Sequence, residues 1–451
     1  MKKRFAWLLA AFLVLALAWP VAAVEHEFGG YWRTRFFAQD GFGVQEDTPI
    51  IEVTEVTDPV TGAVSTSSAV VGNTNQDASQ VDTRTRLYYT AKFSDNFKFV
   101  NKFEFDAVWG EAPSLGGYGD IGADGVKVEI KNSYVDFNLG PHRFEVGVQG
   151  FLLAKGFLFD DDGPGIKAIF KAADNIYLPL IWLRVNEGGA GKNLVGDDNN
   201  DGDVDALIFY PSIYFAKETR LYPHFAYLFS DYYGDYEKSA IPGAGELSVY
   251  TIGLEWDQVI GALSYGLSGV WQGGDVEAVP GGPKLDFKGW LVQAQAAYDL
   301  GSASVNGEFL YASGDDTPLD ADFDFFFNPV GASYYWAEIM GLGIFDTQVP
   351  GNAPGDQMSN LMFFKVGCDF KPMDNLKLKA DLYYAKLAEE NFLTGEDDLG
   401  TELDLVATYA LMDGLNLDLV GAYLWAGDGL SPTGDAQDDP WEVGARLSLS
   451  F

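Results

Sequence analysis

The chain has 451 residues, and its 66 acidic side chains outnumber the 29 basic ones to give a formal net charge of −37. A charge this negative argues against a nucleic-acid partner. Hydrophobic residues make up 47% and aromatic residues 15% of the chain, yet after the N-terminal region no apolar run approaches the about 20 residues that a membrane-spanning helix needs. The single cysteine, Cys368, excludes an intrachain disulfide.

The N-terminus has the pattern of a secretory signal peptide. The basic start MKKR is followed by an apolar run from Phe5 to Trp19 and then by the small residues Ala22 and Ala23. A basic segment, a short apolar segment and small residues at a cleavage position define such a signal. We therefore expect cleavage after Ala23, so that residues 1–23 are removed and residues 24–451 form one barrel domain.

Residues 81–109 show the most regular pattern in the chain. Two runs, VDTRTRLYYTAKF and FKFVNKFEFDAVW, alternate in character from residue to residue, and Ser94-Asp95-Asn96 joins them. A period of two indicates β-strands, because successive side chains leave a strand on opposite faces. Each run is longer than the about 9–11 residues that a tilted strand needs to cross a bilayer. One face is charged and the other apolar, which predicts a hairpin of a transmembrane β-barrel.

The same alternation continues to the C-terminus and predicts an all-β fold, a transmembrane antiparallel β-barrel of about 18 strands. Sixteen strands is the alternative count, because residues 164–186 are apolar and contain few turn residues. Short Asp-, Asn- and Gly-rich turns alternate with longer acidic loops, as short periplasmic turns and long external loops do in outer-membrane barrels. The predicted strands are 27–38, 81–93, 97–109, 126–138, 142–153, 164–172, 176–186, 204–217, 220–230, 246–257, 260–272, 285–298, 302–312, 358–371, 375–386, 401–412, 415–426 and 440–451.

The inward faces of the first five predicted strands collect basic residues. A cationic wall in a water-filled pore attracts anions. Interleaved acids such as Asp82 and Glu104 allow the alternative that opposite charges pair across strands and simply line a wet lumen. The predicted pore-lining residues are Arg33, Arg35, Arg84, Arg86, Lys92, Lys98, Lys102, Lys127, Lys131 and Arg143.

The segment GDDNNDGDVD, residues 196–205, has the spacing of a calcium-binding loop. Asp197, Asn199, Asp201 and Asp203 provide oxygen ligands at alternate positions around Gly202, which suits the coordination of Ca²⁺. The twelfth position, where a bidentate acid is expected, is Ile208. A structural Ca²⁺ site and an ordinary solvated acidic loop are therefore both open, and no other cofactor is expected.

Two long loops interrupt the strand pattern. Residues 40–80 are rich in Thr, Val, Ser and Asn and are compatible with a short external hairpin. Residues 313–357 include DADFDFFFNPVGASYYWAEIMGLGIFD, which is too apolar to remain in water. Loops of this length are usually functional. The second loop either folds into the lumen as a constriction or forms an external lid or protomer contact.

The chain ends in a strand, PWEVGARLSLSF, with a complete apolar face and a terminal Phe451. This ending resembles the signature that the outer-membrane assembly machinery of Gram-negative bacteria recognises. We therefore expect the barrel assembly machinery, outer-membrane lipid and lipopolysaccharide as partners. The three histidines, His26, His142 and His224, are scattered and carry no pattern for acid–base catalysis, so we expect no enzyme.

Residues 84–106, RTRLYYTAKFSDNFKFVNKFEFD, and residues 127–149, KVEIKNSYVDFNLGPHRFEVGVQ, resemble the opening strands of the porin and alginate-export-like outer-membrane families. The resemblance implies an 18-stranded monomeric or a 16–18-stranded trimeric channel, with Arg84 and Arg86 on the family's luminal basic ladder. Here acidic residues interrupt that ladder, and the later strands add few cations.

The sequence thus predicts an outer-membrane porin that passes small hydrophilic solutes passively, with a modest anion preference at the Arg84/Arg86 wall. One alternative is a substrate-specific channel that exports or imports an acidic polysaccharide. Another is a barrel that sheathes a periplasmic electron-transfer partner.

Overall fold

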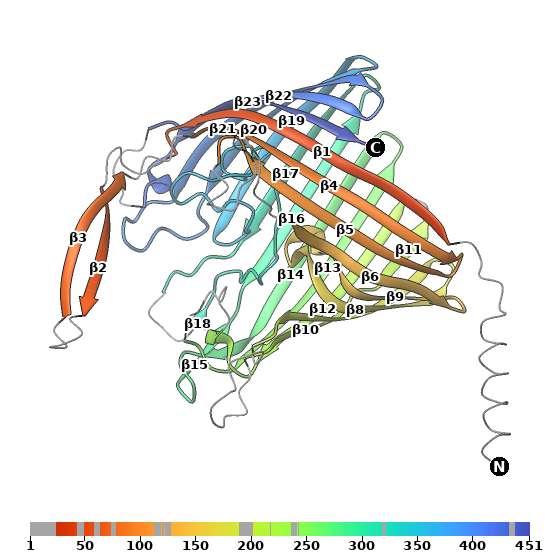
Figure 1. The fold of residues 1–451 in the computed structure, drawn as a ribbon, viewed down its shortest axis with the longest axis horizontal. Coiled ribbons are helices and arrows are strands. Elements are labelled where there is room, and N and C mark those ends of the chain that lie inside the picture. Colours follow the sequence, from red (N-terminus) through yellow and green to blue (C-terminus); the bar gives the residue numbers. More distant parts are fainter. Residues whose placement is uncertain are drawn as a thin grey trace.

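The computed structural model describes residues 24–42, 49–57, 64–73, 78–111, 119, 121, 128–188, 202–216, 218–235, 241, 243–317, 322–432 and 438–451. Within them the chain forms one large sheet of long antiparallel strands that curves round on itself (Figure 1). This sheet has 21 segments, of which β10 and β11 are halves of one strand and β15 and β18 are short rim segments. Eighteen wall strands remain, which confirms the predicted barrel and its strand count.

The first half of the wall contains β1 and the strands from β4 to β12. Their bounds are β1 Glu25–Asp40, β4 Ala78–Ser94, β5 Phe97–Val108, β6 Glu129–Leu139, β7 His142–Leu153, β8 Phe159–Ala173, β9 Ile176–Asn186, β10 Val204–Phe209, β11 Ser212–Ala216 and β12 Thr219–Ser230. The second half continues with β13 Leu247–Ile260, β14 Leu263–Glu277, β16 Trp290–Asp299, β17 Ala303–Ala312, β19 Leu361–Met373, β20 Leu376–Lys386, β21 Asp398–Met412, β22 Leu415–Ala426 and β23 Trp441–Ser450.

The first and last strands close the barrel. In the β1 ladder, Tyr31 lies opposite Arg86 of β4 on one side and opposite Ser450 of β23 on the other. Phe451 continues the seam, because it exchanges main-chain hydrogen bonds with Gly30 at 2.8 and 3.1 Å. Closure leaves no unpaired strand edge in the lipid, which is the condition for a sheet to cross a bilayer.

Side-chain alternation separates a lipid face from a luminal face. On β13, Glu255 is 3% exposed, whereas its neighbours Leu254 and Trp256 are exposed. The strand predicted at 204–217 is divided into β10 and β11 at Tyr210 and Pro211, because proline has no N–H to donate to the ladder. No helix in the described part of the chain is long and apolar enough to cross a membrane.

Several segments lie outside the wall. Strands β2 (Pro49–Thr57) and β3 (Val64–Asn73) form a separate hairpin in the first long loop, as the sequence suggested. Strands β15 (Lys284–Phe287) and β18 (Asp322–Phe323) pair in parallel. Three short 3₁₀ turns complete the described elements, η2 (Ala154–Gly156), η3 (Tyr233–Asp235) and η4 (Asp428–Leu430).

The main apolar core lies inside the barrel. Residues 322–357 of the second long loop, hereafter the inward loop, bury Phe326, Trp336, Ile339, Met340 and Phe345 almost completely. They pack with inward-facing side chains of the wall in two clusters. The structure therefore decides between the two alternatives for this loop in favour of the lumen.

Candidate functional site

Carboxylates on β21 hold the inward loop against the wall. Glu402 accepts the main-chain N–H groups of Ile339 at 2.6 Å and of Met340 at 2.9 Å, and Asp404 accepts that of Glu338 at 3.1 Å. Three consecutive amides of one loop thus point at two carboxylates of one strand. A typical hydrogen bond contributes about 0.5–1.5 kcal/mol to stability, so the three together fix this part of the loop on β21.

Neighbouring contacts extend the seat on both sides. The Tyr383 hydroxyl donates to the Trp336 carbonyl at 2.5 Å, and the Trp336 ring stacks on Phe363 with centroids 4.6 Å apart. Across the barrel seam, the Arg35 guanidinium donates to the Phe345 carbonyl, while the Phe345 ring stacks on another side chain of β1. The loop is therefore attached to β1 on one side of the barrel seam and to β20 and β21 on the other side.

The wall beneath the inward loop is acidic. Asp381 forms ion pairs with Lys379 at 2.7 Å and Lys365 at 3.2 Å, and Asp418 pairs with Arg446 at 2.8 Å. No described lysine or arginine forms an ion pair with four further buried carboxyl groups, which belong to Glu338, Glu402, Asp404 and Glu442. In the loop itself, burial raises the pKa of Glu338 above its ordinary value.

The neighbouring wall, from β1 to β7 on the other side of the β1–β23 seam, carries the basic residues that the sequence singled out, most of them in cross-strand ion pairs. Arg84 pairs with Asp106 at 2.5 Å and with Glu104 at 3.4 Å, and Arg86 pairs with Glu104. Arg35 pairs with Asp82 at 2.5 Å, with both side chains less than a tenth exposed. The alternative of pairing across strands is thus present in the structure, although Arg84 and Arg86 keep about a quarter of their surface exposed (24% and 27%).

The other basic residues vary in their surroundings. Lys98 pairs with Asp136 at 3.0 Å, Arg143 with Asp136 at 2.8 Å, Lys131 with Asp162 at 3.5 Å and Lys92 with Glu27. The Lys102 ammonium lies 5.6 Å from the centre of the Tyr88 ring. Arg33 is buried, with an Nε that has no hydrogen-bond partner in the described structure. Lys127 lies outside the described residues.

A cavity of about 620 Å³ separates this basic wall from the inward loop. Four of the predicted cations, Arg84, Arg86, Lys102 and Lys131, line one side of it. Carboxylates from β8 and from the loop line the remainder, together with apolar, aromatic and hydroxyl residues and glycines. These further residues are Gly150, Phe151, Leu152, Asp160, Asp161, Asp162, Val330, Gly331, Ala332, Ser333, Tyr335 and Asp356.

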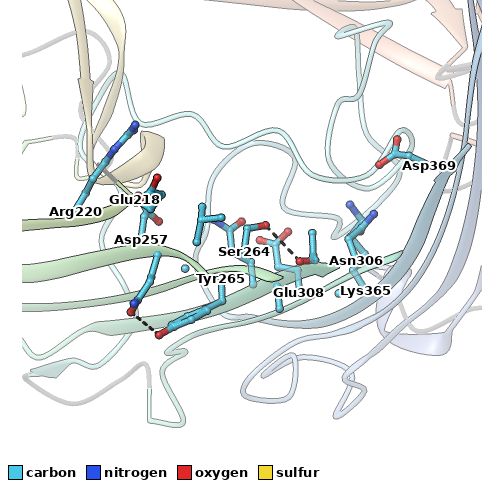
Figure 2. A pocket seen from close by; sticks show the side chains of 16 residues that line it. Glu218, Arg220, Asp257, Ser264, Tyr265, Asn306, Glu308, Lys365 and Asp369 are labelled. Carbon is cyan, nitrogen blue, oxygen red and sulfur yellow. Dashed lines mark hydrogen bonds between the residues drawn. The ribbon is translucent and has the colours of Figure 1, made fainter. Parts of the chain in front are cut away.

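A second cavity, of about 690 Å³, lies along the inner side of strands β12 to β19 (Figure 2). Amide, hydroxyl and charged side chains project into it, and the Tyr265 hydroxyl donates to Gln258 Oε1 at 2.7 Å. These residues were not among the pore-lining residues predicted from the sequence. The signal was available, because Asp257, Gln295 and Glu308 all stand on the polar face of alternating strands.

Most of the residues predicted as calcium ligands lie outside the part of the chain that the structure describes. Asp197, Asn199 and Asp201 lie outside the described residues. The carboxylate of Asp203 pairs with Arg184 and accepts the Gly188 N–H at 3.0 Å. In the described ranges no group of three or more His, Cys, Asp or Glu side chains is arranged to hold a metal ion.

A closed barrel of long strands, with a polar lumen narrowed by its own loop, defines the class of outer-membrane β-barrel channels. A family model described as alginate export matches residues 195–442, and the chain belongs to this family. The match begins after the two segments that carried the resemblance in the sequence, so the two lines of evidence rest on different strands. Both family and fold are those of channels, not of enzymes.

Solved structures with this fold include porin-like channels of other bacteria. OccAB4 of Acinetobacter baumannii is 9% identical with a TM-score of 0.56, over 96% of this chain and 99% of that one. OpdK of Pseudomonas aeruginosa, solved with vanillate, is 12% identical with a TM-score of 0.56, over 95% and 98%. OprD of Pseudomonas aeruginosa is 11% identical with a TM-score of 0.52, over 94% of both chains. No curated protein matches the chain.

Proposed function

We propose that this protein is a passive outer-membrane channel for small hydrophilic solutes, with a modest preference for anions. The observation that carries the proposal is the position of the inward loop. The loop covers the acidic wall of β20 to β23, where Glu402 is fully buried, and leaves the basic wall of β4 to β6 facing the 620 Å³ cavity.

Charge in a constricted section of a pore selects ions more strongly than charge elsewhere. Arg84, Arg86, Lys102 and Lys131 all face the cavity, and Lys102 forms no ion pair with a described carboxylate. Four carboxylates, those of Asp160, Asp161, Asp162 and Asp356, line the same cavity. The near balance of signs is the reason that we propose a modest preference.

The reversal potential of the refolded protein in a planar bilayer, measured in a KCl gradient, tests this proposal. We expect an anion-selective wild type and a shift toward cations in Arg84→Glu/Arg86→Glu. Lys284→Glu/Lys288→Glu is the matched control, since it makes the same charge change at residues outside the cavity. A cation-selective wild type, or equal shifts in both double variants, would contradict the proposal.

The family match favours a second candidate, the transfer of an acidic polysaccharide. A channel of this kind would bind polyuronate oligomers in the lumen, and saturable block of the current by such oligomers would support it. The sheath hypothesis is less well supported, because the chain's own inward loop occupies much of the lumen.

We further propose that residues 1–23 form a cleaved signal peptide and that the barrel assembly machinery inserts the chain through its C-terminal strand, β23. The apolar face of β23 and the terminal Phe451 support the second point. A monomer and a homotrimer remain alternative assemblies, and cross-linking in detergent would distinguish them.

A further inference from the structure

Two opposite charges face each other across the ladder between β17 and β19 without pairing. Glu308 lies directly opposite Lys365, a position in which opposite charges on neighbouring strands normally attract each other. Among the described contacts no ion pair joins the two side chains. Both line the 690 Å³ cavity, and Figure 2 shows them with Asn306 on one side of it. Partners on other elements hold the two charges apart, and both remain in contact with the cavity.

Glu308 is oriented by two neutral donors that bind the same oxygen. The Tyr334 hydroxyl of the inward loop donates to Glu308 Oε1 at 2.5 Å, and the Gln293 amide donates to it at 2.6 Å. The Tyr334 ring is itself fixed, because it packs on Phe157 with centroids 4.7 Å apart. In the described part of the chain nothing donates to Glu308 Oε2, no cation pairs with the carboxylate, and this oxygen is not buried. Oε2 is therefore an acceptor that a solute in the cavity can use.

Lys365 is held on the other side of the gap by β20. Its ammonium lies 3.2 Å from Asp381 Oδ2 and 5.6 Å from the centre of the Tyr383 ring. Asp381 reaches it over Gly367, where a Cβ atom would lie 1.9 Å from Asp381 Oδ1. The same carboxylate pairs with Lys379 at 2.7 Å, so two lysines share one negative charge. An ammonium group has three donors, and Lys365 therefore keeps donors and positive charge for a solute.

We propose that the part of the cavity between Glu308 and Lys365 binds the head group of α-amino acids. The ammonium group of the solute donates to Glu308 Oε2, and its carboxylate accepts from the Lys365 ammonium. The Asn306 amide, which also lines the cavity from β17, offers a further donor to that carboxylate. The volume of about 690 Å³ is in the range of small-molecule sites.

The site selects solutes that carry both charges on adjacent groups. A simple carboxylate meets Glu308 as a like charge, and a simple amine meets Lys365 as a like charge. Only a zwitterion places an opposite charge at each of the two positions. The fold keeps Glu308 and Lys365 from neutralising each other, so the solute supplies the missing partner of both.

This inference rests on the proposed function as a passive solute channel, and it names one class of solute. Arg84 and Arg86 line the other cavity, so the amino-acid site is separate from the residues that set the anion preference. Binding is weak, because Asp381 competes with the solute for the Lys365 ammonium. A channel needs sites that a solute can enter and also leave.

Binding of L-alanine, propionate and ethylamine to the refolded protein tests the proposal, by saturation-transfer NMR titration in detergent micelles. Propionate lacks only the ammonium group of alanine, and ethylamine lacks only its carboxylate. For the wild type we expect a Kd for alanine about tenfold lower than for either analogue, the effect of one charge-assisted hydrogen bond. Equal Kd values for the three probes would overturn the site.

Two variants assign the roles of the two charges. Glu308→Gln should weaken the binding of alanine and ethylamine about tenfold but not that of propionate. Lys365→Met should weaken the binding of alanine and propionate but not that of ethylamine, and Asp381 keeps Lys379 as its partner. Heat-modifiable migration in gels establishes that each variant is folded.

Asp275→Asn and Lys284→Met are the matched controls, because they remove the same charges from an exposed ion pair outside the cavity. Neither control should change the Kd of any probe. An equal loss for all three probes in Glu308→Gln or Lys365→Met would overturn the assignment, since it indicates a collapsed cavity and not the removal of one charge. If the site failed while anion selectivity still depended on Arg84 and Arg86, the channel proposal would stand and only the amino-acid site would fall.

Discussion

Glu402 on β21 accepts the main-chain N–H of Ile339 at 2.6 Å, although the two residues are 63 positions apart in the chain. This contact fixes the apolar inward loop on the acidic side of the lumen and thereby determines which wall faces the solute. Glu402→Ala removes the acceptor for two amides, so we expect the loop to detach and the conductance to rise several-fold. Single-channel recording measures the conductance. Glu402→Gln keeps one acceptor oxygen, so its conductance should lie between those of the wild type and Glu402→Ala. An unchanged conductance in Glu402→Ala would show that the loop is held by other contacts.

The carboxyl groups beneath the loop should make the channel sensitive to pH. Burial raises the pKa of Glu338, so the docked loop favours the protonated form of this group. Below the ordinary pKa of a glutamic acid, about 4.3, the group is protonated in both loop positions and does not weaken docking. As the pH rises above that value, the detached loop gains the ionised form first, and docking becomes weaker.

We therefore expect conductance to increase as the pH rises above about 4.3. Glu338→Gln should reduce this dependence, because its amide stays neutral throughout. Conductance that falls with rising pH would contradict the sign of the prediction.

A single methyl group added at Gly156, in the turn between β7 and β8, should lower the stability of the protein. Gly156→Ala places a methyl group against the Ser333 carbonyl and must keep a positive φ angle. We expect a loss of about 1–3 kcal/mol in the free energy of unfolding, measured by urea titration of the refolded barrel. Gly261→Ala provides the control, because Gly261 also has a positive φ but an added Cβ atom there meets nothing. Equal losses would assign the effect to the backbone angle alone.

The Arg35–Asp82 pair should contribute more to stability than the exposed pairs at the rim. Asp82→Asn leaves the buried Arg35 without its carboxylate, which costs about 3–5 kcal/mol in a buried pair. Asp275→Asn disrupts the exposed pair with Lys284, for which about 0–1 kcal/mol is expected. The same unfolding titration compares the two variants, and similar losses would show that the Arg35 site is better solvated than its burial indicates.

The barrel wall could be predicted from the sequence because lipid and water impose opposite demands on the two faces of each strand. The predicted strand 97–109 corresponds to Phe97–Val108, and all eighteen predicted strands have a counterpart in the wall. The division of the eighth predicted strand at Pro211 could also have been predicted from the sequence, because proline cannot donate a hydrogen bond to the ladder.

The contacts that narrow the lumen could not be predicted in the same way. The sequence shows that residues 313–357 are too apolar for water, but it does not show that Ile339 meets Glu402 on β21. The left-handed turn at Gly156 depends equally on long-range contacts, because the Ser333 N–H donates to the Gly156 carbonyl at 2.9 Å. The pairing of Arg84 with Asp106 is different, since both stand at opposed positions of one predicted hairpin.

Replacement of the inward loop, residues 322–357, by a short Gly-Ser linker tests the central claim most directly. The claim is that this loop narrows the lumen beside the basic wall while it covers the acidic wall. We predict that conductance rises several-fold and that the reversal potential in a KCl gradient moves toward cation selectivity, because the carboxylates of β20 to β23 become exposed. A folded loop-deleted barrel with wild-type conductance and selectivity would contradict the account.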